Sequence, residues 1–374
     1  MLTSALGETA AAPSARTVGA CDVKVWSMTS RERLQRTFRR SGLAEAGGAS
    51  VVLVHEGWVY DESLIGLLAG RPGCAIVDAA GRPVAAHVAA AQAEAAAQGL
   101  ERGELPAGLV AEQLGADALQ GSYNSALRKR EPPVLEPLTA DRVRQVEARL
   151  FQGSYKGVTD LVTKYLWPTP ARIVTRWCAA ARITPNQVTF AGLLLVIAAF
   201  WLFWTGHFGW GLVAAWIMTF LDTVDGKLAR VTLNSSPFGN VFDHGIDLIH
   251  PPFWWWAWWV GVQAGPHPLD DPHYLILWVI LGGYAVQRAV EGVFLRAFKI
   301  HIHSWRRFDS VFRLITARRN PNLLLLTPAA LVGRPDIGLL LVAVWTALSL
   351  LVHVVQLVQA FAAPRASVVS WLAR

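Results

Sequence analysis

The sequence contains little cysteine and little charge. Only three cysteines, Cys21, Cys74 and Cys178, occur in 374 residues. Their spacing does not match a zinc site and their odd number does not match a disulfide framework, so we expect free thiols in a reducing compartment. Charged residues make up 16% of the chain and hydrophobic residues 53%. This composition favours a chain that is partly embedded in a membrane.

A leader-like apolar segment is also missing. The first 25 residues are rich in alanine and serine and have no continuous apolar core, so we expect no cleaved signal peptide. Apolar residues instead concentrate after about residue 186. We expect a flexible tail over residues 1–20, a soluble domain over 21–150, a linker over 151–183 and a membrane domain over 184–374.

The net charge of +7 is carried largely by short loops between apolar runs. A basic chain can bind nucleic acid or anionic lipid. Positive charge confined to such loops favours lipid and phosphate, so no nucleic-acid partner is expected.

The soluble part alternates strand and helix signals, which is typical of an α/β layer. Residues 50–55 form an apolar run suited to a buried parallel strand. Thr29 and Glu32 open a capping box for a helix that extends to about residue 40. We also expect a strand at 23–26, a helix at 61–68, and a hairpin of 74–77 with 83–86 that turns at Gly81.

In its order of elements this part resembles the sugar-phosphate and polyol-phosphate nucleotidyltransferases. Those enzymes hold a nucleoside triphosphate with a glycine-rich loop after the first strand. The corresponding residues 27–31, Ser-Met-Thr-Ser-Arg, contain no glycine. We therefore expect a degenerate domain, with an active cytidylyltransferase as the alternative.

The linker contains a hinge signal and a helix start. Gly153 and Gly157 suggest a hinge, and Thr169-Pro170 is a helix start. The helix from there to Arg182 places Ile173 and Trp177 on one face and arginines on another. We expect it to lie on an anionic leaflet; the alternative is a surface helix of the soluble domain.

Six apolar spans can be drawn in the membrane part, at about 187–206, 209–230, 242–264, 273–297, 320–333 and 336–362. Five tryptophans at 254–256, 258 and 259 suggest an interfacial belt. Loops 204–210 and 263–273 contain no Lys or Arg, whereas residues 296–319 contain seven against one acidic residue. The positive-inside rule then predicts a multi-pass inner-membrane protein with both termini in the cytoplasm.

One stretch at residues 222–247 concentrates carboxylates at the edge of this membrane part. Asp222 and Asp225 are spaced i, i+3, and Asp243 and Asp247 are spaced i, i+4, so each pair shares a helix face. Carboxylates there are costly unless they bind something. All-oxygen ligation suits two Mg²⁺ or Mn²⁺ ions, which could clamp a diphosphate.

The pattern Asp-x2-Asp-Gly-x2-Ala-Arg-x8-Gly-x3-Asp-x3-Asp closely resembles the signature of the CDP-alcohol phosphotransferase family, with all eight positions and every gap present. The resemblance implies a six-helix membrane fold, commonly dimeric. It implies metal binding by Asp222, Asp225, Asp243 and Asp247, with Asp247 also as general base. It places the CDP moiety at Gly226, Ala229, Arg230 and Gly239.

Basic residues outside the motif are candidates for binding the acceptor. Arg288 is spaced i, i+3 from Glu291, so an internal ion pair and acceptor binding are both open. Arg318 and Arg319 open the fifth span, where a guanidinium could grip a phosphate in a bidentate manner; a solvated positive flank is the alternative. We expect His250 to pack or bond beside the aspartates, and His301 and His303 to lie at the surface.

The resemblance implies that an alcohol attacks the phosphoryl group of a CDP-linked donor and releases CMP. We expect CDP-diacylglycerol as donor and a polyol or polyol phosphate as acceptor, in phospholipid biosynthesis. An inositol-phosphodiester synthase with a soluble CDP-polyol donor is one alternative. An ion-coupled transporter is another, although transporter sites tend to lie near the midplane of the membrane in repeated halves.

Overall fold

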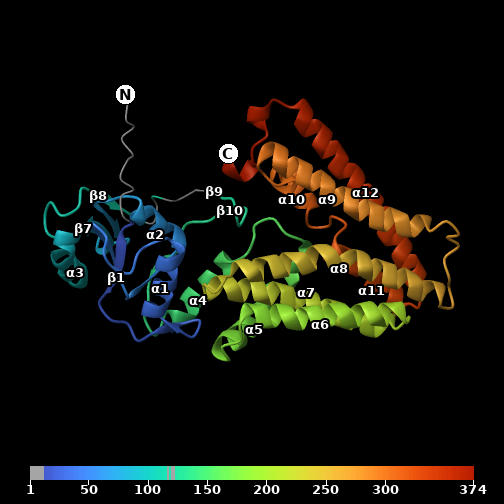
Figure 1. Cartoon of the computed structure of the whole chain (residues 1–374), viewed down its shortest axis with the longest axis horizontal. Helices are drawn as coiled ribbons and strands as arrows, with labels where there is room; N and C mark the ends of the chain where they lie inside the picture. The colour runs from blue at the N-terminus through green and yellow to red at the C-terminus, as the bar shows by residue number, and fades with distance from the viewer. Residues whose placement is uncertain (1–11, 116–117, 119–122) are drawn as a thin grey trace, which may run out of the picture. The chain divides into compact units, whose positions relative to one another are not determined.

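The computed structural model describes residues 12–115, 118 and 123–374. The chain forms two compact units (Figure 1). The α/β unit comprises Met1–Ser122, Arg130–Gly153 and Val231–Leu233. The helical unit comprises Tyr123–Lys129, Ser154–Arg230 and Asn234–Arg374.

The α/β unit is built on a five-stranded mixed sheet in the order β1-β4-β7-β6-β8. These strands are β1 (Ser14–Val18), β4 (Ser50–His55), β7 (Pro83–Ala89), β6 (Cys74–Val77) and β8 (Glu112–Leu114). Four helices accompany it: α1 (Ser30–Arg40), α2 (Glu62–Ala69), α3 (Ala93–Arg102) and α4 (Val143–Gly153). Its short strands are β2 (Lys24–Val25), β3 (Met28–Thr29), β5 (Trp58–Tyr60) and β11 (Leu135–Pro137). Strand β9 (Tyr123–Asn124) lies in the helical unit, where β10 (Lys129–Arg130) also begins.

The local sequence signals explain most of these elements. Thr29 caps α1 by accepting a hydrogen bond from the backbone N–H of Glu32, and Asp61 caps α2. The hairpin of β6 and β7 is confirmed, with Gly81 at a φ of +79° in its turn. The apolar core of β4 is fully buried.

Two expectations for this unit need correction. Strand β4 is parallel only to β1 and pairs antiparallel with β7, so the sheet is mixed. Residues Ser14–Val18 are not a tail, because their backbone pairs with β4 and the side chain of Val18 is buried. Of the expected tail, residues 1–11 lie outside the described part of the chain.

The helical unit contains a helix at each of the six segments expected to be spans. They are α6 (Pro185–Trp204), α7 (Phe208–Val231), α8 (Pro237–Gln263), α9 (Leu275–Phe298), α11 (Arg319–Leu331) and α12 (Pro335–Ala362). Two further helices, α5 (Pro168–Ala180) and α10 (Arg307–Phe312), precede α6 and α11. Helix α6 packs against α8, while α12 packs along α9 and α11 (Figure 1).

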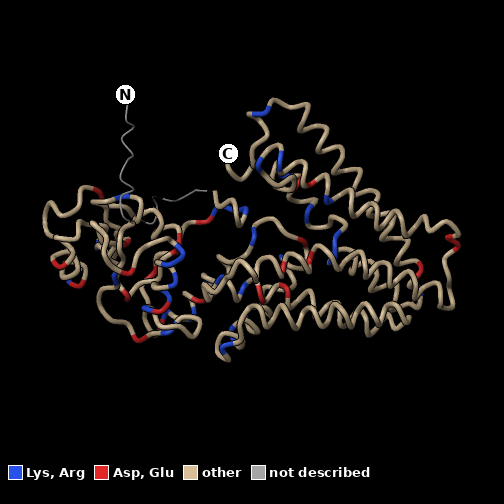
Figure 2. Tube along the Cα trace, in the orientation of Figure 1, with Lys and Arg blue, Asp and Glu red and all other residues tan. Residues whose placement is uncertain are grey.

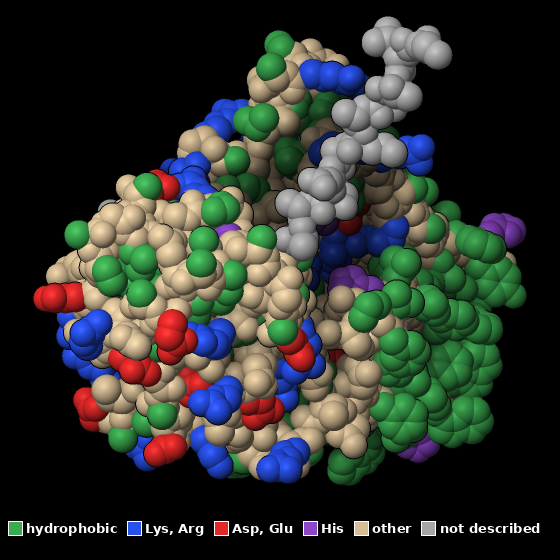
Figure 3. All heavy atoms as spheres, turned by 60° about the vertical axis from the view of Figure 1, so that its left-hand side comes forward, with side chains coloured by type: hydrophobic (Ala, Val, Ile, Leu, Met, Phe, Trp, Pro, Cys, Tyr) green, Lys and Arg blue, Asp and Glu red, His purple; other side chains and the backbone are tan. Residues whose placement is uncertain are grey.

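Three of these helices, α6, α9 and α12, are long and apolar enough to cross a membrane, with mean hydropathies of 2.0, 1.2 and 2.3. These helices contain few charged residues, and most of their length is tan in Figure 2. Large apolar side chains such as Leu194, Ile197 and Trp201 of α6 are exposed. Figure 3 shows a broad field of hydrophobic side chains of this kind.

Three of the five tryptophans of α8 lie in the core rather than in an interfacial belt, whereas Trp256 is exposed. Trp254, Trp255 and Trp258 are at most 1% exposed and form the centre of the hydrophobic core. The indole N–H of Trp254 donates to the carbonyl of Val196, and that of Trp258 to the carbonyl of Pro335, both at 3.0 Å. These bonds satisfy the polar atom that would otherwise favour an interface.

Helix α5 begins two residues earlier than expected. Pro168 occupies the first turn and Trp167 is the N-cap, so Thr169 does not cap the helix. Its buried face is formed by small residues, and the side chains of Ile173 and Trp177 are exposed together with Arg172 and Arg176. The apolar and basic faces expected for this helix are therefore present.

Candidate active site

The four aspartates lie where α7 ends and α8 begins. Asp222 and Asp225 occupy the last turns of α7, and Asp243 and Asp247 the early turns of α8. Ser236 caps α8 by accepting a hydrogen bond of 2.9 Å from the N–H of Gly239. One oxygen each of Asp222, Asp243 and Asp247 lies within 4.8 Å of the other two. The spacing of the aspartates within each helix and the short loop between α7 and α8 thus bring both pairs together.

Asp225 lines the same cavity but is held from another helix. Its Oδ2 accepts a hydrogen bond of 2.6 Å from the hydroxyl of Thr189 on α6. Its Oδ1 is buried and has no hydrogen-bond partner among the described residues. A buried carboxylate oxygen without a donor is costly, and a cation would satisfy it. The donor set therefore fits a hard divalent ion.

Arg319, at the start of α11, neutralises part of this cluster. Its Nη1 is 2.5 Å from Oδ1 of Asp247, and its Nη2 is 2.5 Å from Oδ2 of Asp222. One planar guanidinium thus joins an aspartate of α7 to an aspartate of α8, a geometry available to arginine and not to lysine.

The cluster opens into a cavity of about 710 Å³. All four residues expected to surround the CDP moiety, namely Gly226, Ala229, Arg230 and Gly239, line it. At Gly239 the reason for glycine is a close approach, because a Cβ there would lie 2.5 Å from Oδ1 of Asn186 on α6. At Gly226 a Cβ would meet only the flexible end of Arg230, at 3.1 Å.

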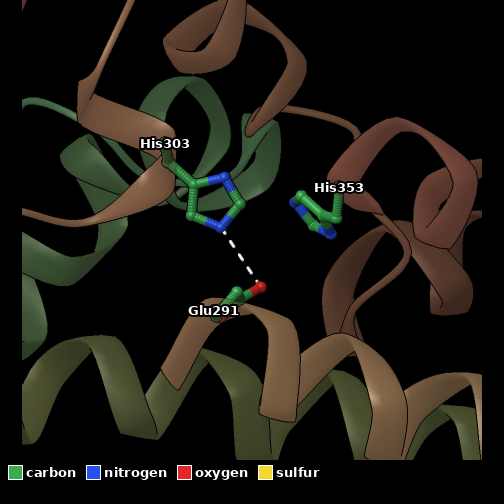
Figure 4. A group of neighbouring side chains, drawn as sticks. All are labelled: Glu291, His303 and His353. Atoms are coloured by element: carbon green, nitrogen blue, oxygen red, sulfur yellow. Dashed lines mark ion pairs between the residues drawn. The ribbon is translucent and has the colours of Figure 1, made fainter. Parts of the chain in front are cut away.

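A second polar cluster, which we call the Glu291 cluster, contains Glu291 of α9, His353 of α12 and His303 of a short 3₁₀ turn at Ile302–Ser304 (Figure 4). His303 was expected at the surface but is buried, and its Nε2 is 3.3 Å from Oε1 of Glu291. Burial lowers the pKa of His303 well below its usual value, which keeps the ring neutral. Only His301 of the two is exposed.

Arginines already fill the Glu291 cluster. Nη2 of Arg288 is 2.6 Å from Glu291 Oε1, and Arg318 is ion-paired with Glu291 Oε2. Nη2 of Arg318 also lies 3.2 Å from Nε2 of His303. With neutral histidines the cluster carries one negative and two positive charges, so a divalent cation is disfavoured there.

The ion pair expected between Arg288 and Glu291 is present, and Arg288 also lines the cavity. Arg318 and Arg319 line the cavity as well. His250 packs as expected: its ring contacts Trp254 at 4.6 Å, and its Nδ1 lies 2.7 Å from the carbonyl of Ile246.

Sequence reasoning missed a basic wall that comes from outside the main helices. Arg128 and Lys156 line the cavity. Burial and the nearby Arg318 lower the pKa of Arg128, and burial and Arg128 lower that of Lys156. Gly157 is not a free hinge: its N–H donates to Leu127 at 2.8 Å, and a Cβ there would lie 2.4 Å from the carbonyl of Arg128. The pair Lys156-Gly157 was the sequence signal that could have indicated this wall.

The family model for CDP-alcohol phosphatidyltransferase matches residues 182–302. That segment contains all four aspartates and both glycines of the motif. This segment is therefore similar to the CDP-alcohol phosphatidyltransferase family. Two helices of the matched segment, α6 and α9, are long and apolar enough to cross a membrane. Arg318 and Arg319 lie beyond the matched residues.

Curated relatives are similar to part of this chain. Cholinephosphotransferase 1 of Xenopus laevis is 30% identical over 132 residues, covering 31% of this chain and 30% of the relative. Ethanolaminephosphotransferase 1 of Pongo abelii is 32% identical over 138 residues, covering 31% of this chain and 32% of the relative. The chain thus spans about a third of the length of these relatives.

The chain also resembles a solved structure. The crystal structure of Mycobacterium tuberculosis phosphatidylinositol phosphate synthase in complex with manganese and citrate gives a TM-score of 0.40 at 19% identity. The similarity covers 50% of this chain and 88% of that chain.

Proposed function

We propose that this protein is a metal-dependent CDP-alcohol phosphotransferase that transfers a phosphatidyl or related group to a hydroxyl and releases CMP. One observation carries the proposal. The aspartates of the family-matched segment, which are 25 residues apart at their extremes, converge in a single cavity with the motif glycines.

Asp222, Asp225, Asp243 and Asp247 would hold two Mg²⁺ or Mn²⁺ ions. When bound, such ions neutralise a diphosphate and stabilise the charge that develops as the phosphodiester forms. Gly226, Ala229, Arg230 and Gly239 would surround the CDP moiety. The absence of side chains at the glycines lets a ligand approach the helix ends closely.

Asp247 is proposed as the general base. Its side chain is 41% exposed to the cavity, the most accessible of the cluster. The acceptor oxygen attacks the phosphorus that carries the donor alcohol, its proton passes to Asp247, and the bond to the CMP oxygen breaks. CMP leaves with the electron pair of that bond, so the step balances without an oxidant or reductant.

The walls of the cavity favour an anionic acceptor such as a polyol phosphate. Arg128, Arg288 and Arg318 line it, each with a buried Nε that has no partner among the described residues. Arg313 lines it too, and burial with the nearby Arg318 lowers its pKa to about 9. Such donors match phosphate oxygens.

The curated relatives are named for choline and ethanolamine, which are cations at neutral pH. A cationic head group would meet like charge beside these arginines. A choline or ethanolamine transfer is therefore the second candidate, supported by sequence similarity alone.

The donor is proposed to be CDP-diacylglycerol; a soluble CDP-polyol remains the alternative. The α/β unit would supply such a CDP-polyol only if it were an active cytidylyltransferase. Two carboxylates contact the segment of the α/β unit that corresponds to the phosphate-binding loop. The N–H of Trp26 donates to Glu147 at 2.8 Å, and Arg31 pairs with Glu56 at 2.7 Å. Carboxylates there would repel a triphosphate, which supports a degenerate nucleotidyltransferase-like domain.

The membrane placement follows from the loop charges. We propose six spans, an active site and termini facing the cytoplasm, α5 lying on the anionic leaflet, and a homodimer as in the resembling family. The exposed Ile173 and Trp177 of α5 support the interfacial placement.

In the test, the purified full-length protein and Mg²⁺ are incubated with labelled CDP-diacylglycerol, and the release of CMP is measured. The acceptor panel contains inositol, inositol phosphate, glycerol phosphate, choline and ethanolamine. Release with a phosphorylated acceptor alone supports the proposal. No release with any donor or acceptor, including CDP-choline with diacylglycerol, would reject it.

A further inference from the structure

Two consecutive arginines reach the two polar clusters of the cavity. Arg318 contacts Glu291 and His303, whereas Arg319 contacts Asp222 and Asp247. Both residues stand at the first turn of α11. The start of α11 is anchored, because Nδ2 of Asn320 donates to Oδ1 of Asp160 at 3.0 Å. The two side chains can therefore change partners without a movement of the helix.

The two arginines differ in what holds them. The Glu291 cluster has a net charge of +1, so no added cation competes with Arg318 for it. The aspartate cluster has four carboxylates, Asp222, Asp225, Asp243 and Asp247, against Arg319 and the nearby Arg230. Divalent ions bind carboxylate oxygens, so they compete with Arg319 for Asp222 and Asp247.

We propose that Arg319 is a resident counter-ion of the aspartate cluster, which divalent metal displaces and which then binds the anionic group of the acceptor. This inference rests on the proposed function of the same site. Arg319 holds Oδ2 of Asp222 and Oδ1 of Asp247 in the metal-free protein and keeps the carboxylates from repelling one another. Metal loading releases the guanidinium into the cavity beside Arg318.

The released side chain has a use in the cavity. Its Nε is already buried there without a partner among the described residues. Together with the fixed Arg318, it would offer two adjacent guanidinium groups to one phosphate. Because coupling between two ligands is reciprocal, metal then tightens phosphate binding and phosphate tightens metal binding through Arg319. The metal site is thus completed before the acceptor is held.

The first test measures Mn²⁺ binding to the full-length protein without any substrate. Binding is monitored as the loss of the free-ion signal in electron paramagnetic resonance. Arg319→Ala removes the competitor, so we expect its Kd for Mn²⁺ to fall roughly tenfold, within the usual range for coupled sites. Arg319→Lys keeps the charge but cannot bridge both aspartates, and should lie between. If Arg319→Ala does not fold, Arg319→Lys against the wild type carries the test.

Two controls separate competition from general charge. Arg318→Ala removes the neighbouring charge, and Arg296→Ala removes an exposed charge from α9. Neither should tighten Mn²⁺ more than about twofold, as expected for partly screened charges. Equal tightening in Arg318→Ala and Arg319→Ala, or unchanged binding in Arg319→Ala, would overturn the proposal.

The second test uses inorganic phosphate as the probe. In the wild type, saturating Mn²⁺ should lower the Kd for phosphate, and Arg319→Ala should lose most of this effect while Arg296→Ala keeps it. Persistence of the effect in Arg319→Ala would mean that the ion alone holds the phosphate. A wild type that binds no Mn²⁺ would reject the proposed function itself, whereas normal Mn²⁺ binding without the Arg319 effect would reject only this inference.

Discussion

The hydroxyl of Thr189 donates a 2.6 Å hydrogen bond to Oδ2 of Asp225. Both side chains are buried, at 8% and 4% exposure. The bond orients the carboxylate so that one oxygen faces α6 and the other, Oδ1, is left without a partner among the described residues. A residue that precedes the family motif by more than thirty positions therefore prepares one of its ligands.

Thr189→Val should lower activity without unfolding the protein. Loss of a partner that orients a metal ligand typically costs about 10–100-fold in metal affinity or activity. The measurement is CMP release as a function of Mg²⁺ concentration. Thr175→Val is the matched control, because Thr175 is equally buried and its hydroxyl has no partner in the described structure; an equal loss there would assign the effect to packing.

Asp222→Asn and Asp243→Asn should each abolish CMP release while the protein still inserts in the membrane. Each change removes a charge from the cluster and replaces a ligand oxygen by an amide. Asp336→Asn should retain activity, because Asp336 lies at the start of α12 and is ion-paired with Arg334. Normal turnover in either cluster variant contradicts the metal assignment.

Gly239→Ala should disturb the cavity far more than Gly245→Ala. The new Cβ would lie 2.5 Å from Oδ1 of Asn186, whereas at Gly245 nothing lies within 4 Å. Both glycines are in α8, so helix propensity changes equally and favours alanine by about 1 kcal/mol in each. We expect a raised KM for the CDP donor in Gly239→Ala alone; similar kinetics of the two variants would show that the close approach is unimportant.

Glu291→Gln should destabilise the helical unit and weaken acceptor binding. It leaves Arg288 and Arg318 facing an amide, and an uncompensated, largely buried charge costs about 1–3 kcal/mol. Thermal unfolding in detergent should show a lower midpoint, and the KM for a phosphorylated acceptor should rise. The exposed Glu101→Gln serves as the control. A fall in KM would instead mean that Glu291 competes with the acceptor for its arginines.

His303 should make the protein sensitive to mild acid. Burial holds its folded-state pKa below the unfolded value of about 6.5. Below that value the unfolded chain binds more protons, so stability is lost as the pH falls, by at most about 1.4 kcal/mol per pH unit for one group. His303→Gln should reduce the change in thermal midpoint between pH 7.5 and 5.5. His273→Gln, at an exposed position, should not.

Local signals were sufficient for many elements. The cap at Thr29, the turn at Gly81 and the six long apolar segments each depend on residues that are close in sequence. The same holds for the aspartates, because i, i+3 and i, i+4 spacing places each pair on one helix face and the short loop returns the chain. Composition, however, could not tell a buried tryptophan from an interfacial one, since both environments are apolar. Trp254 lies in the core, where its indole N–H donates a hydrogen bond to the carbonyl of Val196.

The sequence by itself determined the chemistry of residues 222–247: which carboxylates, which glycines, and on which helix ends. Only the tertiary structure decided what opposes them. Thr189 on Asp225, Arg319 across Asp222 and Asp247, and Arg318 in the Glu291 cluster join residues 27 to 97 positions apart. Such contacts depend on how the helices pack rather than on a local period in the sequence. The partner of a long side chain is set by which neighbouring helix packs beside it.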